Sequence, residues 1–401
     1  MVEVPEELRM LQLALRRFVR NELMPFERRV LAGEAIPTEE QDRLQAGIRE
    51  LGTWWVGVPT ELGGPGFGLL GTVVISEELS KVLVSGNLYS AGPPPLLEGG
   101  TPEQQERWLW PVLEGKKTWC FALTESGGGS DPAGNMETTA VRDGENWIIN
   151  GRKVFVTAGD TADFAVVFAL TDKAKRERGG IGAFVVEKGT PGLTVVRTIR
   201  TMLEVDPVEL DFQDIVVPDL NRLGRESSGF VTAQRALTAA RVQIGARGLG
   251  MADRLLEMGL EYSKDRISFG KPISERQGVQ FMLADCAIGL YACRTMTYDT
   301  AWRSDRGEDT RLQASIVKIF ASEMMWDVAD RILQIHGGWG YSKDLPVEAF
   351  LRLARLWRIA EGPNEVHRWV IARAAAGVWH EPASACEVGF SRSATSAVSR
   401  L

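Results

Sequence analysis

Hydrophobic residues recur with a helical period along the first hundred residues. Leu8, Leu11, Leu15 and Val19 follow one another at spacings of three and four, which is typical of the buried face of an amphipathic helix over 6–19. Similar spacing, interrupted by Gly- and Pro-rich segments, predicts further helices over 39–51, 72–81 and 102–113. We therefore expect an all-α domain over residues 1–119.

The hydrophobic period changes to two after residue 119. Apolar and acidic residues alternate strictly from Val208 to Phe212, which predicts a strand with one buried face. Asp143-Gly144 and Asn150-Gly151 predict tight hairpin turns, because these residue types tolerate positive φ. Other short β-rich segments lie at 145–149, 154–157, 164–170, 182–187 and 193–197. This pattern predicts an antiparallel β-domain over 120–229.

The helical period returns near residue 230 and continues almost to the end. Long helices are expected at 230–266, 278–304, 310–335 and 347–359, and four such helices suggest a bundle over 230–380. Residues 381–401 are rich in Ser and Ala without a clear period, so we expect a loosely ordered tail. Because strands and helices do not alternate, the order favours an α+β fold over a parallel α/β fold.

The composition is that of a protein that buries a core, with 44% hydrophobic and 25% charged residues among 401. The net charge of −7 and the lack of a basic block argue against a nucleic-acid partner. Apolar stretches such as 164–170 are far shorter than the roughly 20 residues of a membrane helix, so we expect a soluble protein without a membrane partner. Four scattered cysteines and three unclustered histidines favour a reducing, cytoplasmic location and no metal site.

Residues 66–71 spell G-x-G-x-x-G, the fingerprint of a dinucleotide-binding loop. The fingerprint needs a preceding strand, a βαβ unit and an acidic residue about 20 positions later, and none of these is predicted here. We interpret the segment as an ordinary Gly-rich loop.

Three other segments could carry chemistry. Residues 121–131 contain three consecutive glycines between Thr124 and Ser130, which fits a ligand-cradling loop or a flexible surface turn. His336, in the segment 334–341, fits a helix end closed by glycine, and Glu361 fits a solvated charge after a helix. Taken one at a time, none of the three decides between a functional and a structural role.

Taken together and in this order, these segments resemble the acyl-CoA dehydrogenase family over about residues 6–376. The specific signatures are the T-E-x-G-x-G-S-D loop at 124–131 and the E-G-P-N-E segment at 361–365. Further matching pieces are 51–59 with Gly63-Gly64, 75–79, 155–157, 265–272 and 366–373. The resemblance implies an acyl-CoA dehydrogenase-like fold with an N-terminal all-α domain, a middle antiparallel β-domain and a C-terminal four-helix bundle, with FAD between the last two.

The resemblance also implies which residues of the β-domain hold FAD. Those of the glycine-rich loop would line the flavin, and Ser130 would also lie near the substrate. The segment 155–157 resembles the family's W-I-T, in which the aromatic ring packs on the flavin and the threonine reaches its N5 edge. The residues in question are Phe121, Leu123, Thr124, Gly129, Ser130, Phe155, Val156 and Thr157.

In the helical bundle, the resemblance assigns three further groups to FAD. Arg266 and Ser268, followed by Phe269 and Gln277, match positions at the pyrophosphate, for which an arginine fork is well suited. A stretch with Gln334, Gly337 and Gly338 resembles one that reaches the FAD of a neighbouring subunit, which implies a homo-oligomer, either a dimer or a tetramer. Pro363, Asn364 and Glu365 would close over the cofactor.

The resemblance makes Glu361 the catalytic base of a 2,3-dehydrogenation of an acyl-CoA thioester. Burial under an acyl chain would raise its pKa above the free value near 4.3 and strengthen it as a base. Some branches place the base directly before the arginine matched by Arg241, but Ala240 stands there in this chain, which favours Glu361. Arg241 would orient the substrate or the base, and Gly362 would contact the substrate. Pro363 replaces the threonine that is common after Glu-Gly.

Three functions remain open within this resemblance. The first is a dehydrogenase that passes electrons to an electron-transfer flavoprotein, and the second is an oxidase or monooxygenase in which oxygen reoxidises the flavin. The third is a non-catalytic flavoprotein that binds partners or DNA, against which Glu361 and the net charge of −7 both argue. The sequence does not fix the length or branching of the acyl group.

Overall fold

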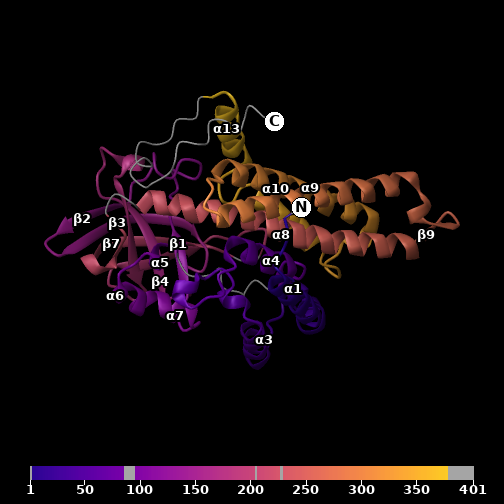
Figure 1. Cartoon of the computed structure of the whole chain (residues 1–401), viewed down its shortest axis with the longest axis horizontal. Helices are drawn as coiled ribbons and strands as arrows, with labels where there is room; N and C mark the ends of the chain where they lie inside the picture. Colours follow the sequence, from indigo (N-terminus) through magenta and orange to yellow (C-terminus); the bar gives the residue numbers. More distant parts are fainter. Residues whose placement is uncertain (1, 85–94, 204–205, 226–228, 378–401) are drawn as a thin grey trace. The chain divides into compact units, whose positions relative to one another are not determined.

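The computed structural model describes residues 2–84, 95–203, 206–225 and 229–377 (Figure 1). The chain divides into two compact units, one formed by Met1–Ala91 and Thr238–Ala374, the other by Gly92–Leu237 and Ala375–Leu401. The expected tail, 381–401, lies outside the described residues. The division into three domains at 119, 229 and 380 stays a prediction.

The first unit begins with four α-helices, of which the hydrophobic period predicts the first, the third and the fourth but not the short second one. They are α1 (Glu6–Phe18), α2 (Glu27–Leu31), α3 (Thr38–Glu50) and α4 (Gly68–Leu79). Helix α4 is the most deeply placed, because every residue from Val73 to Leu79 is buried. Its two buried acids are paired: Glu77 with Arg294 at 2.8 Å and Glu78 with Arg16 at 2.6 Å.

The G-x-G-x-x-G segment leads into the start of helix α4. The backbone N–H groups of Leu69 and Leu70 donate to the carboxylate of Asp305 at 2.7 and 2.9 Å. A helix N-terminus attracts anions because its first N–H groups lack partners within the helix. Here a side chain of the same chain fills that role, as expected for a structural loop.

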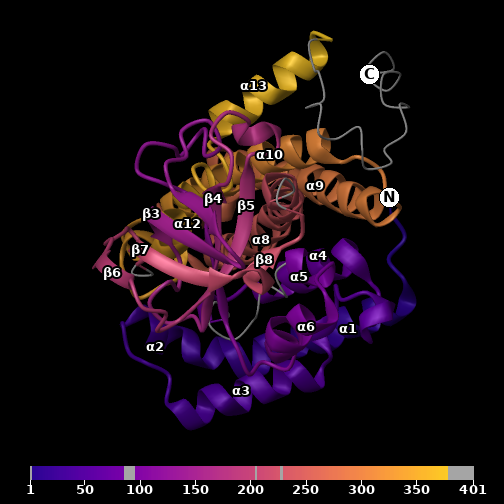
Figure 2. The same cartoon turned by 90° about the vertical axis from the view of Figure 1, so that its left-hand side faces the viewer.

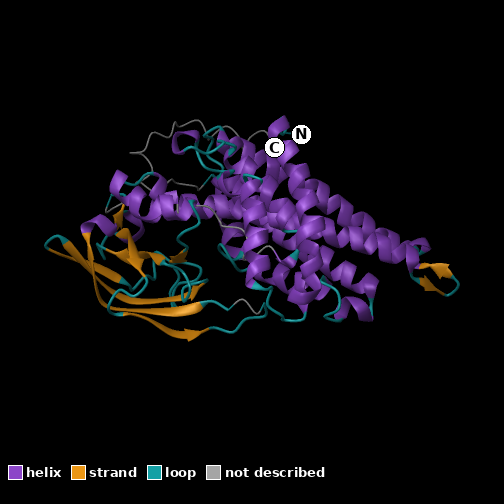
Figure 3. Ribbon diagram, turned by 90° about the horizontal axis from the view of Figure 1, so that it is seen from below, coloured by secondary structure: helices purple, strands orange, loops and turns teal. Residues whose placement is uncertain are grey.

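The remainder of the first unit is a helical bundle (Figure 3). It contains α9 (Gln277–Asp305), α10 (Arg311–His336), α12 (Val347–Trp357) and most of α8 (Gly229–Asp265), with the short α11 (Gly338–Tyr341) and with α13 (Asn364–Ala375) after α12. A hairpin of β9 (Ile267–Ser268) and β10 (Lys271–Pro272) joins α8 to α9. The four expected helices are confirmed within two residues at each end, whereas the hydrophobic period does not predict α13.

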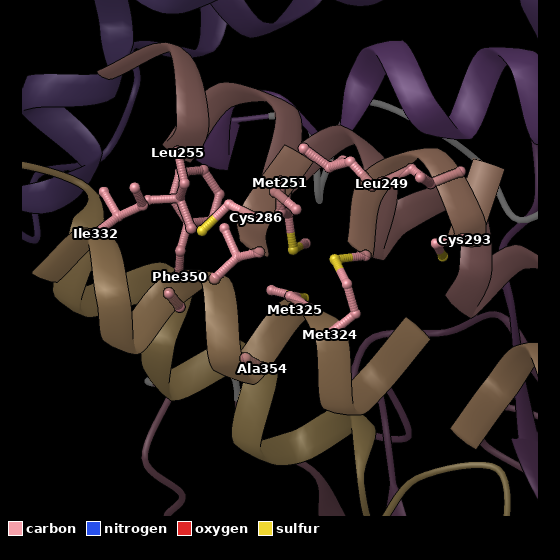
Figure 4. Close-up of a cluster of buried hydrophobic side chains, with 14 of the residues drawn as sticks. Leu249, Met251, Leu255, Cys286, Cys293, Met324, Met325, Ile332, Phe350 and Ala354 are labelled. Carbon is pink, nitrogen blue, oxygen red and sulfur yellow. The ribbon is translucent and has the colours of Figure 1, made fainter. Parts of the chain in front are cut away.

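Side chains from the four long helices form one core (Figure 4). Leu255 of α8, Cys286 of α9, Ile332 of α10 and Phe350 of α12 are all 4% exposed or less. Each helix therefore contributes an apolar face to this shared core, as in four-helix bundles.

The second unit contains a sheet in the order β6-β7-β3-β2-β4-β5-β8, with β1 paired to β4 (Figure 2). Its strands are β1 (Trp119–Ala122), β2 (Thr139–Asp143), β3 (Asn146–Val156), β4 (Phe164–Leu170), β5 (Ile181–Glu187), β6 (Leu193–Thr198), β7 (Val208–Pro218) and β8 (Arg222–Leu223). The short helices α5 (Pro95–Glu98), α6 (Pro102–Gln104) and α7 (Trp110–Leu113) precede it. Most pairings are antiparallel, as expected, but β1 and β2 both run parallel to β4.

One of the two expected turns is present and the other is wrong. Asp143 pairs with Asn146 around Gly144, which has φ +59°, so Asp143-Gly144 closes the β2–β3 hairpin. Asn150 and Gly151 instead lie inside β3, where the register with β7 shifts. A Cβ on Gly151 would collide with Thr138, so this glycine allows close packing instead of a turn.

Candidate active site

Glu361 lies on a turn between α12 and α13 with an unusual backbone. Its φ is +56° and that of Gly362 is +92°, two consecutive left-handed values. Such a conformation is uncommon for a residue with a side chain and is often found at functional sites. A Cβ on Gly362 would lie 3.0 Å from His367 Nε2, so both conformation and space require glycine there.

Two side chains donate to the backbone oxygen of Glu361. Arg241 Nε approaches it at 3.2 Å and His367 Nε2 at 3.0 Å. Burial lowers the pKa of His367 to about 4, so the ring is neutral. Because Glu361 O can only accept a hydrogen bond, the proton is on Nε2. Nδ1 then accepts from the hydroxyl of Ser315 on α10, 3.1 Å away. The turn is thus tied to α8 and α10.

Lys318 of α10 holds the next backbone oxygen. Its Nζ donates to Gly362 O at 2.6 Å and to Asn364 Oδ1 at 2.7 Å, and the side chain is completely buried. Burial, reinforced by the charge of Arg241, lowers the pKa of Lys318 to about 8. Asn364 Nδ2 donates in turn to Ser322 Oγ at 3.0 Å. The side chain of Asn364 therefore points into the bundle.

The carboxyl group of Glu361 is poised between two opposing influences. Burial raises its pKa, while the positive charges of Arg241, Arg247 and Lys318 lower it, and burial has the larger effect. A carboxylate with a raised pKa binds a proton more tightly than a free glutamate. The turn therefore presents a fixed carboxylate that can act as a general base.

In the second unit, the buried Lys153 forms hydrogen bonds with the first residues of the glycine-rich loop. Lys153 Nζ of β3 donates to Leu123 O at 3.0 Å and to Glu125 Oε1 at 2.7 Å. The backbone N–H of Val154 donates to Thr124 O at 2.8 Å. These contacts fix one edge of the loop, and Gly129 and Ser130 remain exposed at the other.

Beside this loop, β3 turns an aromatic ring outward. Phe155 lies within the register shift between Lys153 and Val156, has φ +55° and is 61% exposed. Thr157, two residues later, is also exposed. Bulges of this kind re-aim side chains near active sites. An exposed flat ring with nearby hydroxyls suits a flat heteroaromatic ring with polar edges, which fits the isoalloxazine of FAD.

A pocket of about 520 Å³ lies at the other end of α8 in the first unit. Arg266, Ser268, Gly337 and Gly338 line it, so two of the predicted cofactor groups come together. Gly337 and Gly338 would have no atom within 4 Å of an added Cβ, which leaves their backbone open to a ligand. An arginine, a hydroxyl and exposed backbone suit a phosphate group.

Aromatic side chains that no sequence motif marks as ligand-binding also line the pocket. Tyr262 stacks on His336 with ring centroids 4.4 Å apart, and Trp339, 58% exposed, contributes to the lining. Phe269, 96% exposed at the tip of the β9–β10 hairpin, is not among the lining residues, nor are Gln277 and Gln334.

The remaining predicted residues lie as follows. Phe121 packs its ring on Phe168 at 4.8 Å, Val156 is buried in the sheet, Pro363 is half-buried, and Glu365 is exposed.

The described part of the chain has no cluster of three His, Cys, Asp or Glu residues that could hold a metal. Nor does any described helix have the length and apolarity needed to cross a membrane.

The fold and these features define a flavin-dependent oxidoreductase. The chain matches the acyl-CoA dehydrogenase N-terminal domain over residues 5–116, the middle domain over 120–215 and the C-terminal domain over 227–376. It therefore belongs to the acyl-CoA dehydrogenase family, and its cofactor is FAD.

Individual relatives cover nearly the whole chain. The (R)-benzylsuccinyl-CoA dehydrogenase of Thauera aromatica is 35% identical over 92% of this chain and 95% of its own length. The caffeyl-CoA reductase-Etf complex subunit CarC of Acetobacterium woodii is 36% identical over 81% of this chain and 87% of its own. The solved butyryl-CoA dehydrogenase of Megasphaera elsdenii superposes with a TM-score of 0.85 at 33% identity, covering 94% of this chain and all of that one.

Proposed function

We propose that the protein catalyses the 2,3-dehydrogenation of an acyl-CoA thioester, with Glu361 as the base. The observation that carries this proposal is the partly buried Glu361, on a turn whose backbone oxygens are held by Arg241, His367 and Lys318. Butyryl, benzylsuccinyl and caffeyl thioesters occur in the names of the relatives, so family membership alone leaves the acyl group open.

The proposed step is a proton transfer from carbon 2 to Glu361. Because burial raises its pKa, the carboxylate gains more from accepting this proton than an exposed glutamate would. Arg241 and His367 act through the backbone oxygen of Glu361 and keep the carboxylate in place, so we treat both as positioning residues. FAD, when bound, supplies the acceptor for the hydride that leaves carbon 3.

We propose that the glycine-rich loop with Phe155 and Thr157 holds the flavin end of FAD. The pocket of Arg266, Ser268, Gly337 and Gly338 would hold the phosphates. The segment with Gln334, Gly337 and Gly338 resembles one that reaches the FAD of a neighbouring subunit. This resemblance supports the further proposal that the protein is a homo-oligomer that shares FAD between subunits.

An electron-transfer flavoprotein is the proposed electron acceptor. A relative is named as a subunit of a caffeyl-CoA reductase-Etf complex, and the same family fold would suit a similar partner here. A cytoplasmic location stays a prediction from the scattered cysteines.

The test is an anaerobic titration of the purified holoenzyme with saturated acyl-CoAs, following the visible flavin absorbance. We expect the wild type to bleach with at least one class of thioester. Glu361→Gln should keep its FAD and bind the thioester but fail to bleach. Bleaching by Glu361→Gln at the wild-type rate would remove Glu361 from the proposed role, and oxygen consumption during turnover would identify an oxidase instead.

A further inference from the structure

A second cation from α8 lies close to the base. Arg247 follows Arg241 by six residues, or about 9 Å along the axis, and its charge acts on Glu361. The positive charges of Arg241, Arg247 and Lys318 all lower the pKa of Glu361, against the effect of burial. Glu323 and Glu365 act on Lys318, but Glu323 is itself paired with Arg368 at 2.6 Å. A buried region with several cations is suited to an anionic ligand.

Trp357 supplies a second, independent observation at the same place. Trp357 precedes Glu361 by four residues in the sequence. The guanidinium of Arg247 lies 5.4 Å from the centre of the Trp357 indole ring. The Trp357 side chain is buried, with only 9% of the residue exposed, and its Nε1 has no hydrogen-bond partner among the described residues. A buried N–H without an acceptor destabilises the folded protein and calls for an explanation.

One ligand group accounts for both observations. A carboxylate can accept from the indole N–H and from an arginine fork at the same time, and charge-assisted bonds of this kind are the strong ones. We infer that Arg247 and Trp357 form a carboxylate subsite, and that the preferred substrates are thioesters whose acyl group ends in a second carboxylate. This inference rests on the proposed function and narrows its substrate class.

Binding can be measured without turnover in the Glu361→Gln holoenzyme. The probes are matched pairs of increasing chain length, each with the same number of acyl carbons: glutaryl-CoA with pentanoyl-CoA, then adipyl-CoA with hexanoyl-CoA. We expect the dicarboxylic member of at least one pair to bind about tenfold or more tightly by equilibrium dialysis. Equal or weaker binding of the dicarboxylic member in every pair would overturn the inference.

Variants then assign the preference to the two residues. Added to Glu361→Gln, Arg247→Met should lower the affinity for the dicarboxylic member about 30-fold and leave its neutral partner within about threefold. Trp357→Phe keeps an aromatic ring but removes the pyrrole ring with its N–H, so it should lower the same preference by about fivefold. A merely structural Trp357 would leave the preference unchanged. Arg43→Met removes an exposed cation that pairs with Glu22 and serves as the charge control.

Turnover separates a failure of this inference from a failure of the proposed function. Arg247 also acts on the pKa of Glu361, so its loss can change reduction rates with every substrate, and the ratio between paired substrates is the relevant quantity. Bleaching of the wild-type flavin by neutral thioesters but not by dicarboxylic ones overturns the subsite and leaves the dehydrogenase intact. Bleaching by neither class overturns both.

Discussion

The ammonium group of Lys318 lies 2.6 Å from the backbone oxygen of Gly362, at a position that solvent does not reach. This contact fixes the turn from the side of α10, while Arg241 fixes it from α8. The base is therefore held through its own main chain, and its carboxylate stays available for a proton.

Replacing Lys318 with Met should lower both stability and rate. Gly362 O and Asn364 Oδ1 would lose their donor, at a cost of about 1–3 kcal/mol in the free energy of unfolding. The pKa of Lys318 is lowered to about 8, so in the wild type the rate of flavin reduction should fall as pH rises through that value. Stopped-flow reduction across pH should show that this upper limb is missing in Lys318→Met.

Lys188→Met provides the control, because Lys188 is exposed and donates only to Asp160 O among the described contacts, at 2.9 Å. It should retain the wild-type pH profile. An unchanged upper limb in Lys318→Met would assign the alkaline loss of activity to another group.

His367 should make the protein less stable in acid. Its pKa is lowered from 6.5 to about 4 in the folded state, so between these values the unfolded chain binds more protons. Stability from this group is therefore complete above about pH 6.5 and is lost as pH falls toward 4, by about 3 kcal/mol in all. Urea unfolding at several pH values should show this slope in the wild type. His367→Gln should reduce the slope, and an identical slope would contradict the buried neutral ring.

Gly362→Ala should damage the base more than it damages the fold. Alanine at φ +92° is strained, by about 1–2 kcal/mol, and its Cβ would also press on His367 Nε2. The matched control is Gly33→Ala, where φ is +74° and an added Cβ meets nothing within 4 Å. Both variants should lose stability, but only Gly362→Ala should reduce the flavin at least about tenfold more slowly. Equal rates would mean that the turn adjusts without moving Glu361.

Lys153→Met should weaken the hold on FAD from within the β-domain. It would leave Glu125, which is buried, without its cation, and losing one partner of such a pair costs about 3–5 kcal/mol. The loop carbonyl of Leu123 would also lose its donor. FAD content after dialysis measures the loss of cofactor binding. The double variant Glu125→Gln/Lys153→Met removes both charges and is compared with Lys153→Met in stability. The double variant should be more stable than Lys153→Met alone, and a less stable one would contradict a pairing role.

Mixing two inactive variants should restore activity if FAD is shared between subunits. Arg266→Met lacks a residue of the proposed phosphate pocket, and Glu361→Gln lacks the proposed base. A mixed oligomer would contain sites with the base from one subunit and the arginine from another. Co-expression with two affinity tags, followed by flavin reduction with a reactive thioester, measures this recovery. Mixed oligomers without activity would mean that Glu361 and Arg266 of the same subunit hold the same FAD molecule.

The fold could be predicted largely because its elements are long or strongly periodic. Strand β4 has the expected bounds, since a run of apolar residues from Phe164 to Leu170 is flanked by polar ones. The turn predicted at Asn150-Gly151 is wrong for a physical reason. Gly151 is needed for close packing against Thr138, which precedes strand β2 and so lies outside the local sequence pattern around Gly151. The parallel pairing of β1 with β4 likewise depends on tertiary packing, and the local hydrophobic period does not predict it.

The site could be predicted only where a motif marked it. The resemblance pointed to Glu361 and Arg241, but the residues that hold the turn from α10 and α13 were missed. One signal was present for Lys318, which stands on a helical stripe with the buried Ala314, Ala321 and Met325. A lysine in such a stripe needs a buried acceptor, and only the three-dimensional structure shows that Gly362 O provides it.

Asp305 gives the G-x-G-x-x-G segment a different significance from the one its glycines suggest. Because its carboxylate is tethered to α9 and already lies against the N–H groups of Leu69 and Leu70, its local effective concentration is in the millimolar range or above. A free phosphate would have to compete with a ligand that never diffuses away. The Asp305 carboxylate therefore already fills the anion-binding position at the start of α4. A glycine fingerprint of this kind can bind a side chain of its own chain instead of a dinucleotide.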